Sequence, residues 1–124
     1  MSDLVRVAVD AMGGDYAPVE PVKGAVEAVN ADERVKVQLV GQVDVIEKEL
    51  QKYTYPKERV EIVPATEIIE TGEPPVNAIR HKKDSSIVVG MKKVRYGEAD
   101  AFVSSGSTGA VLVGGQTIVG LSLI

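Results

Sequence analysis

The sequence predicts an α/β protein in which helices flank a mainly parallel sheet. Short β-branched segments alternate four times with helical segments, and the turns between them are short. With 124 residues the chain is long enough for a modest core, so residues 1–124 are expected to form a single α/β domain. A composition that is 44% hydrophobic and 26% charged is typical of globular proteins.

The first strand–helix unit lies at the N-terminus. Residues 5–9 form a β-branched run that is typical of a strand. Gly13 and Gly14 follow in the connecting loop, where adjacent glycines permit positive φ and a close approach of ligand or backbone. Pro18 and Pro21 fall in the first turn of a helix, where a missing amide hydrogen costs nothing. That helix has an apolar stripe at the spacing of a buried face, made by Val22, Ala25, Val26 and Val29.

Two further strands are expected in the middle of the chain. Residues 35–40 alternate between apolar and polar side chains, as a strand does, and Gly41 turns the chain. Residues 60–63 predict another strand, which ends at Pro64. The helix between these strands has its expected apolar face at Val43, Ile46 and Leu50.

Residues 65–75 show no sustained period, and their last five residues favour a turn. A short basic helix is expected over residues 76–83. A second helix follows and stops at Gly97. Its candidate N-caps are Asp84, Ser85 and Ser86, and its inward positions are Ile87, Met91 and Val94.

The last strand and the turn after it predict an anion site. The strand covers residues 100–103, and an apolar helix begins at about Ala110. Between them a strand–turn–helix unit directs turn amides and the positive end of the helix at one place, as α/β proteins do to hold phosphate. Parallel sheets bind ligands beyond the carboxyl ends of their strands. Residues 10–15, which follow the first strand, are expected at the same edge of the sheet. Hydroxyl donors in the turn are Ser104, Ser105, Ser107 and Thr108.

Residues 111–124 would be apolar on nearly every side of a helix, and no charged or capping residue follows them. A helix of this kind is normally buried by further structure. We therefore expect either that the chain is the N-terminal part of a longer protein or that a partner covers this helix.

The composition argues against several function classes. A net charge of −4 gives no broad basic surface for nucleic acid, and aromatic residues are too few for base stacking. Without cysteine there is no disulfide, thiolate metal site or cysteine nucleophile, and the single His81 excludes a multi-histidine metal site. The sequence shows no secretory signal and no stretch long enough to span a bilayer, so a cytoplasmic location is expected.

Two stretches carry a family resemblance. Residues 7–18 include the run Val-Asp-Ala-Met-Gly-Gly-Asp, and residues 104–110 read Ser-Ser-Gly-Ser-Thr-Gly-Ala. Together they resemble the two signatures of the bacterial acyl-ACP:phosphate acyltransferases, the PlsX family. The second signature of that family has alanine where this chain has Ser105 and asparagine where it has Ser107. Members of the family are also considerably longer than this chain.

The resemblance implies a fold and an activity. The fold is a doubly wound three-layer α/β/α arrangement like that of isopropylmalate dehydrogenases and phosphate acetyltransferases, here truncated. The activity is transfer of a fatty acyl group from acyl carrier protein to inorganic phosphate, which gives acyl phosphate for phospholipid synthesis. It further implies a homodimer, peripheral association with the inner face of the membrane, and a functional link to a membrane acyl-phosphate:glycerol-3-phosphate acyltransferase. No cofactor is implied.

The residues and the resemblance together give candidate site residues. Asp10 and Asp15 are the catalytic candidates, expected to accept a proton or to position a cation or water. Arg80, Lys82 or Lys83 is expected to offset the charge of a bound dianion. Phosphate as the nucleophile needs no covalent enzyme intermediate, so orientation and electrostatics are expected to supply most of the rate. The candidates for binding phosphate or substrate are Gly13, Gly14, Arg80, Ser86, Ser104, Gly106, Ser107, Thr108 and Gly109, and no metal ligand is expected.

Each candidate also has a structural interpretation. Gly106 and Gly109 fit a tight turn, Asp10 fits a loop hydrogen-bond acceptor, and Ser86 fits a helix cap. Residues 80–83 are typical of a solvated helix face. Two alternative functions follow: an inactive fragment that only binds phosphate or a phosphorylated metabolite, and a generic nucleotide- or metabolite-binding domain. Against the second, the chain has neither Gly-x-x-x-x-Gly-Lys nor Gly-x-Gly-x-x-Gly.

Overall fold

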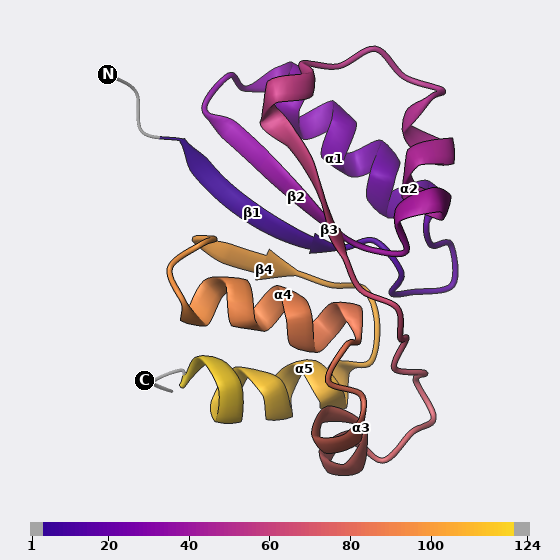
Figure 1. The fold of residues 1–124 in the computed structure, drawn as a ribbon, viewed down its shortest axis with the longest axis vertical. Coiled ribbons are helices and arrows are strands. Elements are labelled where there is room, and N and C mark those ends of the chain that lie inside the picture. Colours follow the sequence, from indigo (N-terminus) through magenta and orange to yellow (C-terminus); the bar gives the residue numbers. More distant parts are fainter. Residues whose placement is uncertain (1–3, 121–124) are drawn as a thin grey trace.

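The structure is a computed structural model that describes residues 4–120. Its four parallel strands form one sheet in the order β3-β2-β1-β4 (Figure 1). The strands are β1 (Val5–Asp10), β2 (Val35–Gly41), β3 (Val60–Pro64) and β4 (Ala101–Val103).

Helices cover both faces of the sheet. On one face α1 packs against β1 and β2, and α2 packs against β3. On the other, α4 packs against β1, β2 and β4, while α3 and α5 lie beside each other and α5 also contacts α4 (Figure 1). The helices are α1 (Val19–Ala31), α2 (Val43–Leu50), α3 (Pro75–His81), α4 (Ser86–Arg95) and α5 (Thr108–Gly114), with short segments η1 (Lys57–Arg59) and η2 (Gly115–Val119).

The alternation of side chains along β2 explains why two layers of helices form. Val37 and Leu39 pack in one apolar cluster with α1, whereas Val40 packs in another with residues of α4. Because successive side chains of a strand point to opposite faces, an apolar run of this kind must be covered on both sides. The predicted three-layer α/β/α class is confirmed.

Most predicted elements are confirmed, and the differences lie at helix ends. The four residues of the α1 stripe are all buried. The last helix begins at Thr108 rather than near Ala110, because Ser107 caps it. It then continues as the π-helical η2, and the part of the expected helix beyond Gly120 lies outside the described residues.

Two smaller expectations were wrong. The basic helix ends at His81 rather than at residue 83. Val43, expected on a buried face, is exposed because it is the first residue of α2 and lies at its open end. Val94, expected to point inward, is half-buried and packs against the apolar cluster between α4 and the sheet.

The order of the strands creates a switch point between β1 and β4. From β1 the chain moves outward through β2 to β3, and it then returns to place β4 on the opposite side of β1. The register pairs Val9 with Val103, so Asp10, the last residue of β1, lies beside Ser104, the first residue after β4. In open parallel sheets, ligands bind at the carboxyl ends of strands at such a point.

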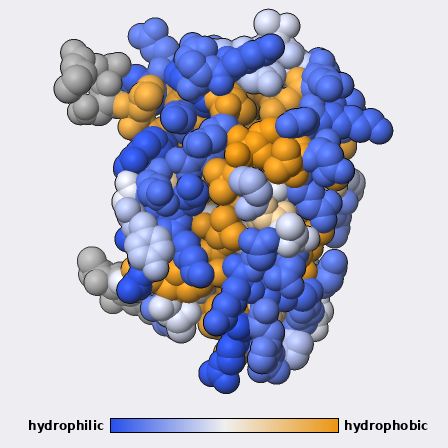
Figure 2. Space-filling view, in the orientation of Figure 1, coloured by the Kyte–Doolittle hydropathy of each residue, from blue (hydrophilic) through white to orange (hydrophobic). Residues whose placement is uncertain are grey.

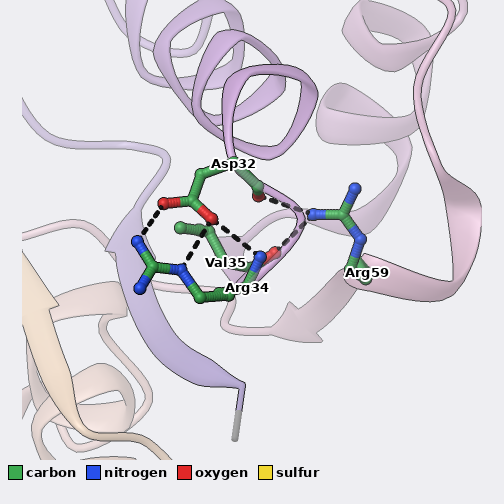
Figure 3. Close-up of polar contacts among 4 residues, drawn as sticks. All are labelled: Asp32, Arg34, Val35 and Arg59. Atoms are coloured by element: carbon green, nitrogen blue, oxygen red, sulfur yellow. Dashed lines mark hydrogen bonds and ion pairs between the residues drawn. The ribbon is translucent and has the colours of Figure 1, made fainter. Parts of the chain in front are cut away.

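A polar cluster fixes the opposite end of the sheet, where α1 leads into β2 (Figure 3). Nη2 of Arg34 lies 2.9 Å from Oδ2 of Asp32, and Nη1 of Arg59 donates to the carbonyl oxygens of Asp32 and Val35 at 3.0 and 2.8 Å. The hydrogen bonds from the Arg34 side chain and backbone lower the pKa of Asp32 to about 2. These contacts stabilise the turn between α1 and β2, at the end of the sheet opposite the switch point.

Hydrophobic residues gather across the middle of the face seen in Figure 2, with hydrophilic residues around them. Exposed large apolar side chains include Tyr16, Val76, Val103 and Leu112. Between residues 4 and 120, none of the helices combines the length and the apolar character needed to cross a membrane.

Candidate functional site

A buried aspartate at the carboxyl end of β1 ties three segments together. Asp10 is 2% exposed, and its Oδ1 accepts hydrogen bonds from the Ser86 hydroxyl at 2.6 Å and from the Met12 amide at 3.0 Å. Its Oδ2 accepts from the Ser104 hydroxyl at 2.7 Å. The Ser104 oxygen in turn accepts from the Gly106 amide at 3.0 Å. We refer to Asp10, Ser86, Ser104 and Gly106 as the Asp10 cluster.

This geometry favours a positioning role for Asp10. Three donors already occupy its carboxylate oxygens, and the side chain is closed off from solvent. Ser86 joins the cluster because the neighbouring Ser85 takes the capping role in its place. The Ser85 hydroxyl oxygen accepts from the Val88 amide at 3.2 Å. Of the three cap candidates, Ser85 is therefore the N-cap of α4.

Glycines let the loops after β1 and β4 touch. A Cβ atom on Gly13 would lie 2.9 Å from the Gly106 nitrogen and would overlap Oδ2 of Asp10. Gly14 has a φ of +93° and packs against Ser105. The close approach expected at Gly13 and Gly14 is thus an approach of one loop to the other, and it requires residues without side chains.

The helix after β4 begins at the same edge of the sheet. Ser107 is buried, and its hydroxyl oxygen accepts from the Ala110 amide at 3.2 Å. The amides of Thr108 and Gly109 belong to the first turn of α5, where a helix offers no carbonyl partner. Thr108 is exposed, whereas Gly109 packs closely against Pro75 at the start of α3.

The cations expected to offset an anionic charge lie on or just after α3. Arg80 and Lys83 are exposed, and within residues 4–120 no hydrogen bond or ion pair joins either side chain to the Asp10 cluster. Lys82 is engaged elsewhere: its Nζ lies 2.6 Å from Oε2 of Glu73 and donates to the Ile68 carbonyl at 2.7 Å. The hydrogen bond from Lys82 is the main reason that the pKa of Glu73 is lowered. Lys82 therefore holds the loop before α3.

An apolar groove of about 460 Å³ opens beside the Asp10 cluster. Val7 and Val9 of β1 line it, together with Val103 of β4 and Gly24 of α1. Asp15 lies at the end of the groove formed by the loop after β1, and it is exposed. The structure thus separates the two catalytic candidates: Asp10 is buried in the cluster and Asp15 faces the open groove.

Sequence reasoning did not find the groove or the contact between Gly109 and Pro75. Both depend on the strand order and on helix packing, which residue spacing does not specify. One signal was present: Gly24 is an exposed residue of α1 outside its apolar stripe, where glycine weakens a helix and leaves space. In the part of the chain that the structure describes, no three acidic or histidine side chains are grouped to hold a metal ion.

Comparison with known proteins gives a family and several relatives. Residues 5–123 match the family model described as fatty acid synthesis protein. The chain is 50% identical over 117 residues to a protein of Alkaliphilus oremlandii named phosphate acyltransferase, with 94% of this chain and 34% of the relative covered. Proteins of the same name from Halothermothrix orenii and Clostridioides difficile are each 47% identical over 116 residues, again with 94% of this chain covered. These matches cover 35% and 34% of the two relatives, so the chain spans about a third of the length of the curated relatives it matches.

Proposed function

The chain belongs to the fatty acid synthesis protein family, and from this membership we propose that it is the part of a phosphate acyltransferase that holds inorganic phosphate. The proposed reaction transfers a fatty acyl group from acyl carrier protein to phosphate. The relatives named phosphate acyltransferase support the class of reaction, and acyl carrier protein enters through the resemblance of residues 7–18 and 104–110.

One observation carries the proposal: two glycine loops meet over a buried carboxylate at the switch point of the sheet. The Asp10 cluster fixes the loop that leads into α5, because Ser104 donates to Asp10 and accepts from the Gly106 amide. The amides of Thr108 and Gly109 lie in the first turn of α5, where the helix itself offers no carbonyl partner, and they then have a defined direction. Preorganised amides and a helix dipole stabilise an anion without reorganisation during the reaction.

The proposed acyl transfer requires that the protein bind and orient the phosphate, and it does not require a nucleophilic side chain. An oxygen of hydrogen phosphate attacks the thioester carbonyl carbon, a carbon–oxygen bond forms, and the carbon–sulfur bond breaks. The hydroxyl proton of the phosphate ends on the thiol of the carrier. No covalent enzyme intermediate is required, so orientation and electrostatic stabilisation supply the rate. Within this scheme Asp10 is a positioning residue, and Asp15, which is exposed and lines the groove, remains the candidate for accepting a proton or positioning a cation or water.

The test places this chain in a complete enzyme. In a chimaera the chain replaces the matching third of the Halothermothrix orenii relative, and phosphate-dependent release of thiol from acyl carrier protein is measured. Gly106→Val is expected to lower turnover by about tenfold or more, because its side chain would press on Ser104 and Gly13 and misplace the loop. Gly72→Ala is the control, since a Cβ there meets nothing within 4 Å. Normal turnover by Gly106→Val, in a chimaera with an unchanged melting temperature, would overturn the assignment of the loop.

A second candidate function concerns the chain by itself, since it spans only about a third of its relatives. In this alternative it binds phosphate or a phosphorylated metabolite and does not catalyse. Calorimetric titration of the chain with phosphate, acyl phosphate and nucleotides separates the two candidates from a general nucleotide-binding domain. Turnover of acyl carrier protein thioesters by the chain alone would contradict the second candidate.

A further inference from the structure

The segment between β3 and α3 is tied near both of its ends to the turn between α3 and α4. Near its start, the Thr66 hydroxyl and amide donate to Oδ2 of Asp84 at 2.6 and 3.0 Å. Near its end, Nζ of Lys82 lies 2.6 Å from Oε2 of Glu73. Asp84 and Lys82 both belong to the turn that follows α3. This turn therefore fixes the path by which the chain reaches α3.

Lys82 is the central donor of the second tie. Its Nζ also donates to the Ile68 carbonyl oxygen at 2.7 Å, and Oε2 of Glu73 also accepts from the Glu70 amide at 2.7 Å. The side chains of the pair are 31% and 27% exposed, so they are partly shielded from water. Short charge-assisted hydrogen bonds of this kind are among the stronger ones in proteins. The ion pair therefore sets the position of Pro75, two residues after Glu73.

The start of α3 touches the loop that is proposed to hold phosphate. Pro75 is the first residue of α3, and a Cβ on Gly109 would lie 2.5 Å from its Cγ. Behind this contact, Ala78 and Ala110 are buried in one apolar cluster, and α3 and α5 lie side by side (Figure 1). A proline ring packed on a backbone without a side chain leaves no gap to absorb a movement. A shift of Pro75 is therefore transmitted to Gly109.

The turn between α3 and α4 also reaches the other end of this loop. It leads to Ser86, whose hydroxyl donates to Asp10 at 2.6 Å. The Asp10 cluster fixes the Gly106 amide, before α5 begins. Gly109, in the first turn of α5, is held by Pro75. One turn thus supports the phosphate loop at two places, through α4 at Gly106 and through the ion pair at Gly109.

We propose that Lys82 is a positioning residue for phosphate, acting through its ion pair with Glu73, which holds Pro75 against Gly109. The proposal rests on the proposed function and names the contact that orients its phosphate loop. It differs from the expectation that Lys82 offsets the charge of a bound dianion. The two roles give opposite results when Glu73 is removed. A lysine freed from its partner would attract phosphate more strongly, whereas a lost support weakens phosphate binding.

The binding test is calorimetric titration of this chain with inorganic phosphate. Lys82→Met and Glu73→Ala are each expected to raise the Kd for phosphate by about tenfold, because the amides of the loop lose their preorganised direction. The double variant is expected to bind no more weakly than either single variant, since the two side chains act as one unit. Lys82→Arg, which keeps a cation with N–H donors, is expected to retain most of the affinity. Tighter binding by Glu73→Ala, or additive losses in the double variant, would overturn the proposal.

Two controls separate this role from a general loss of stability. Lys52→Met breaks a different ion pair, in which Nζ of Lys52 lies 2.9 Å from Oε2 of Glu49. That pair lies at the end of α2, which packs against β3 at the opposite edge of the sheet from β4. Gly72→Ala changes the segment before α3 at a position where a Cβ meets nothing within 4 Å. Both controls are expected to keep the phosphate affinity of the unchanged protein. If Lys52→Met and Lys82→Met lost affinity equally, at equal melting temperatures, the proposal would be wrong.

A measurement without ligand separates this proposal from the proposed function. The amide NMR signal of Gly109 is expected to shift, and its hydrogen exchange to become faster, in Lys82→Met and Glu73→Ala but not in Lys52→Met. In the Halothermothrix orenii chimaera, Lys82→Met is expected to raise KM for phosphate and to leave KM for the acyl carrier protein thioester unchanged.

The outcomes distinguish the two failures. Phosphate binding and turnover that are the same in Lys82→Met, Glu73→Ala and the unchanged protein refute the positioning role and leave the proposed function standing. An unaltered Gly109 amide in both variants refutes it as well, whether or not phosphate binds. A Gly109 amide that depends on the ion pair, in a chain that binds no phosphate and a chimaera without turnover, refutes the proposed function alone.

Discussion

The Ser86 hydroxyl donates to Oδ1 of Asp10 at 2.6 Å, although 76 residues separate the two in the sequence. Both side chains are buried, at 1% and 2% exposure, so no water can take the place of the hydroxyl without rearrangement. We expect Ser86→Ala to lower the free energy of unfolding by about 1–3 kcal/mol, because a buried acceptor loses a partner. Urea denaturation measures this loss.

The control for this prediction is Ser105→Ala. Ser105 is exposed, and its hydroxyl makes no hydrogen bond within the described residues, so a change within about 0.5 kcal/mol is expected. Equal urea midpoints for Ser86→Ala and the unchanged protein would show that the bond between Ser86 and Asp10 does not stabilise the fold.

Gly13→Ala should separate the loops after β1 and β4. The new methyl group would lie 2.9 Å from the Gly106 nitrogen and overlap Oδ2 of Asp10, and neither neighbour is the end of a flexible side chain free to move. Overpacking of this kind costs roughly 1–3 kcal/mol, so a lower melting temperature is expected, together with weaker phosphate binding in calorimetry. Gly72→Ala, in open space, is expected to change neither quantity. A Gly13→Ala protein with unaltered stability and phosphate affinity would contradict the close contact.

The strands and the main apolar faces could be predicted because they follow from local patterns. The stripe of α1 and the four strands depend on spacing within one segment, and they are found within a residue or two of the expected ends. The bond between Ser86 and Asp10 depends on strand order and on which serine caps α4. Ser85 and Ser86 have the same side chain, so composition alone could not decide between them. The groove likewise exists only because β4 lies beside β1.

Asp32 gives a prediction about acid stability. Hydrogen bonds from the Arg34 side chain, and then from its backbone, lower the pKa of Asp32 from 3.8 to about 2 in the folded protein. Because the pKa of Asp32 is lower in the folded protein than in the unfolded one, its ionised carboxylate stabilises the fold at pH values above 3.8. This stabilisation is lost as the pH falls from 3.8 through about 2 and the carboxylate becomes protonated. The difference in unfolding free energy between the unchanged protein and Asp32→Asn is therefore expected to shrink over this interval. Denaturant titrations at several pH values measure it.

Arg34→Gln serves as the matched variant for Asp32, because it removes the donor that lowers the pKa. In this pH interval the unfolding free energy of Arg34→Gln should depend on pH as weakly as that of Asp32→Asn. Comparing variants in this way removes the contribution of Asp84 and Asp100, whose pKa values are also lowered in the folded protein. A difference between the unchanged protein and Asp32→Asn that stays constant down to pH 2 would refute the lowered pKa of Asp32.

Ser107 tests whether the start of α5 tolerates the asparagine that the PlsX signature has at this position. The Ser107 hydroxyl oxygen caps the helix by accepting from the Ala110 amide at 3.2 Å. Ser107→Ala is expected to cost about 1 kcal/mol of unfolding free energy, whereas Ser107→Asn should retain most of the stability, because asparagine caps helices as well as serine does. Thr108→Ala, at an exposed position after the cap, is the control.

The phosphate affinity of the same variants shows whether Ser107, besides capping α5, also orients the proposed anion site. An asparagine that caps with its oxygen keeps an N–H donor to offer, so Ser107→Asn is expected to bind phosphate at least as tightly as the unchanged protein in calorimetry. Ser107→Ala is expected to bind more weakly, because the amides of Thr108 and Gly109 lose a defined direction when the first turn frays. If both variants lose stability equally and neither alters phosphate binding, Ser107 neither caps α5 nor orients the anion site.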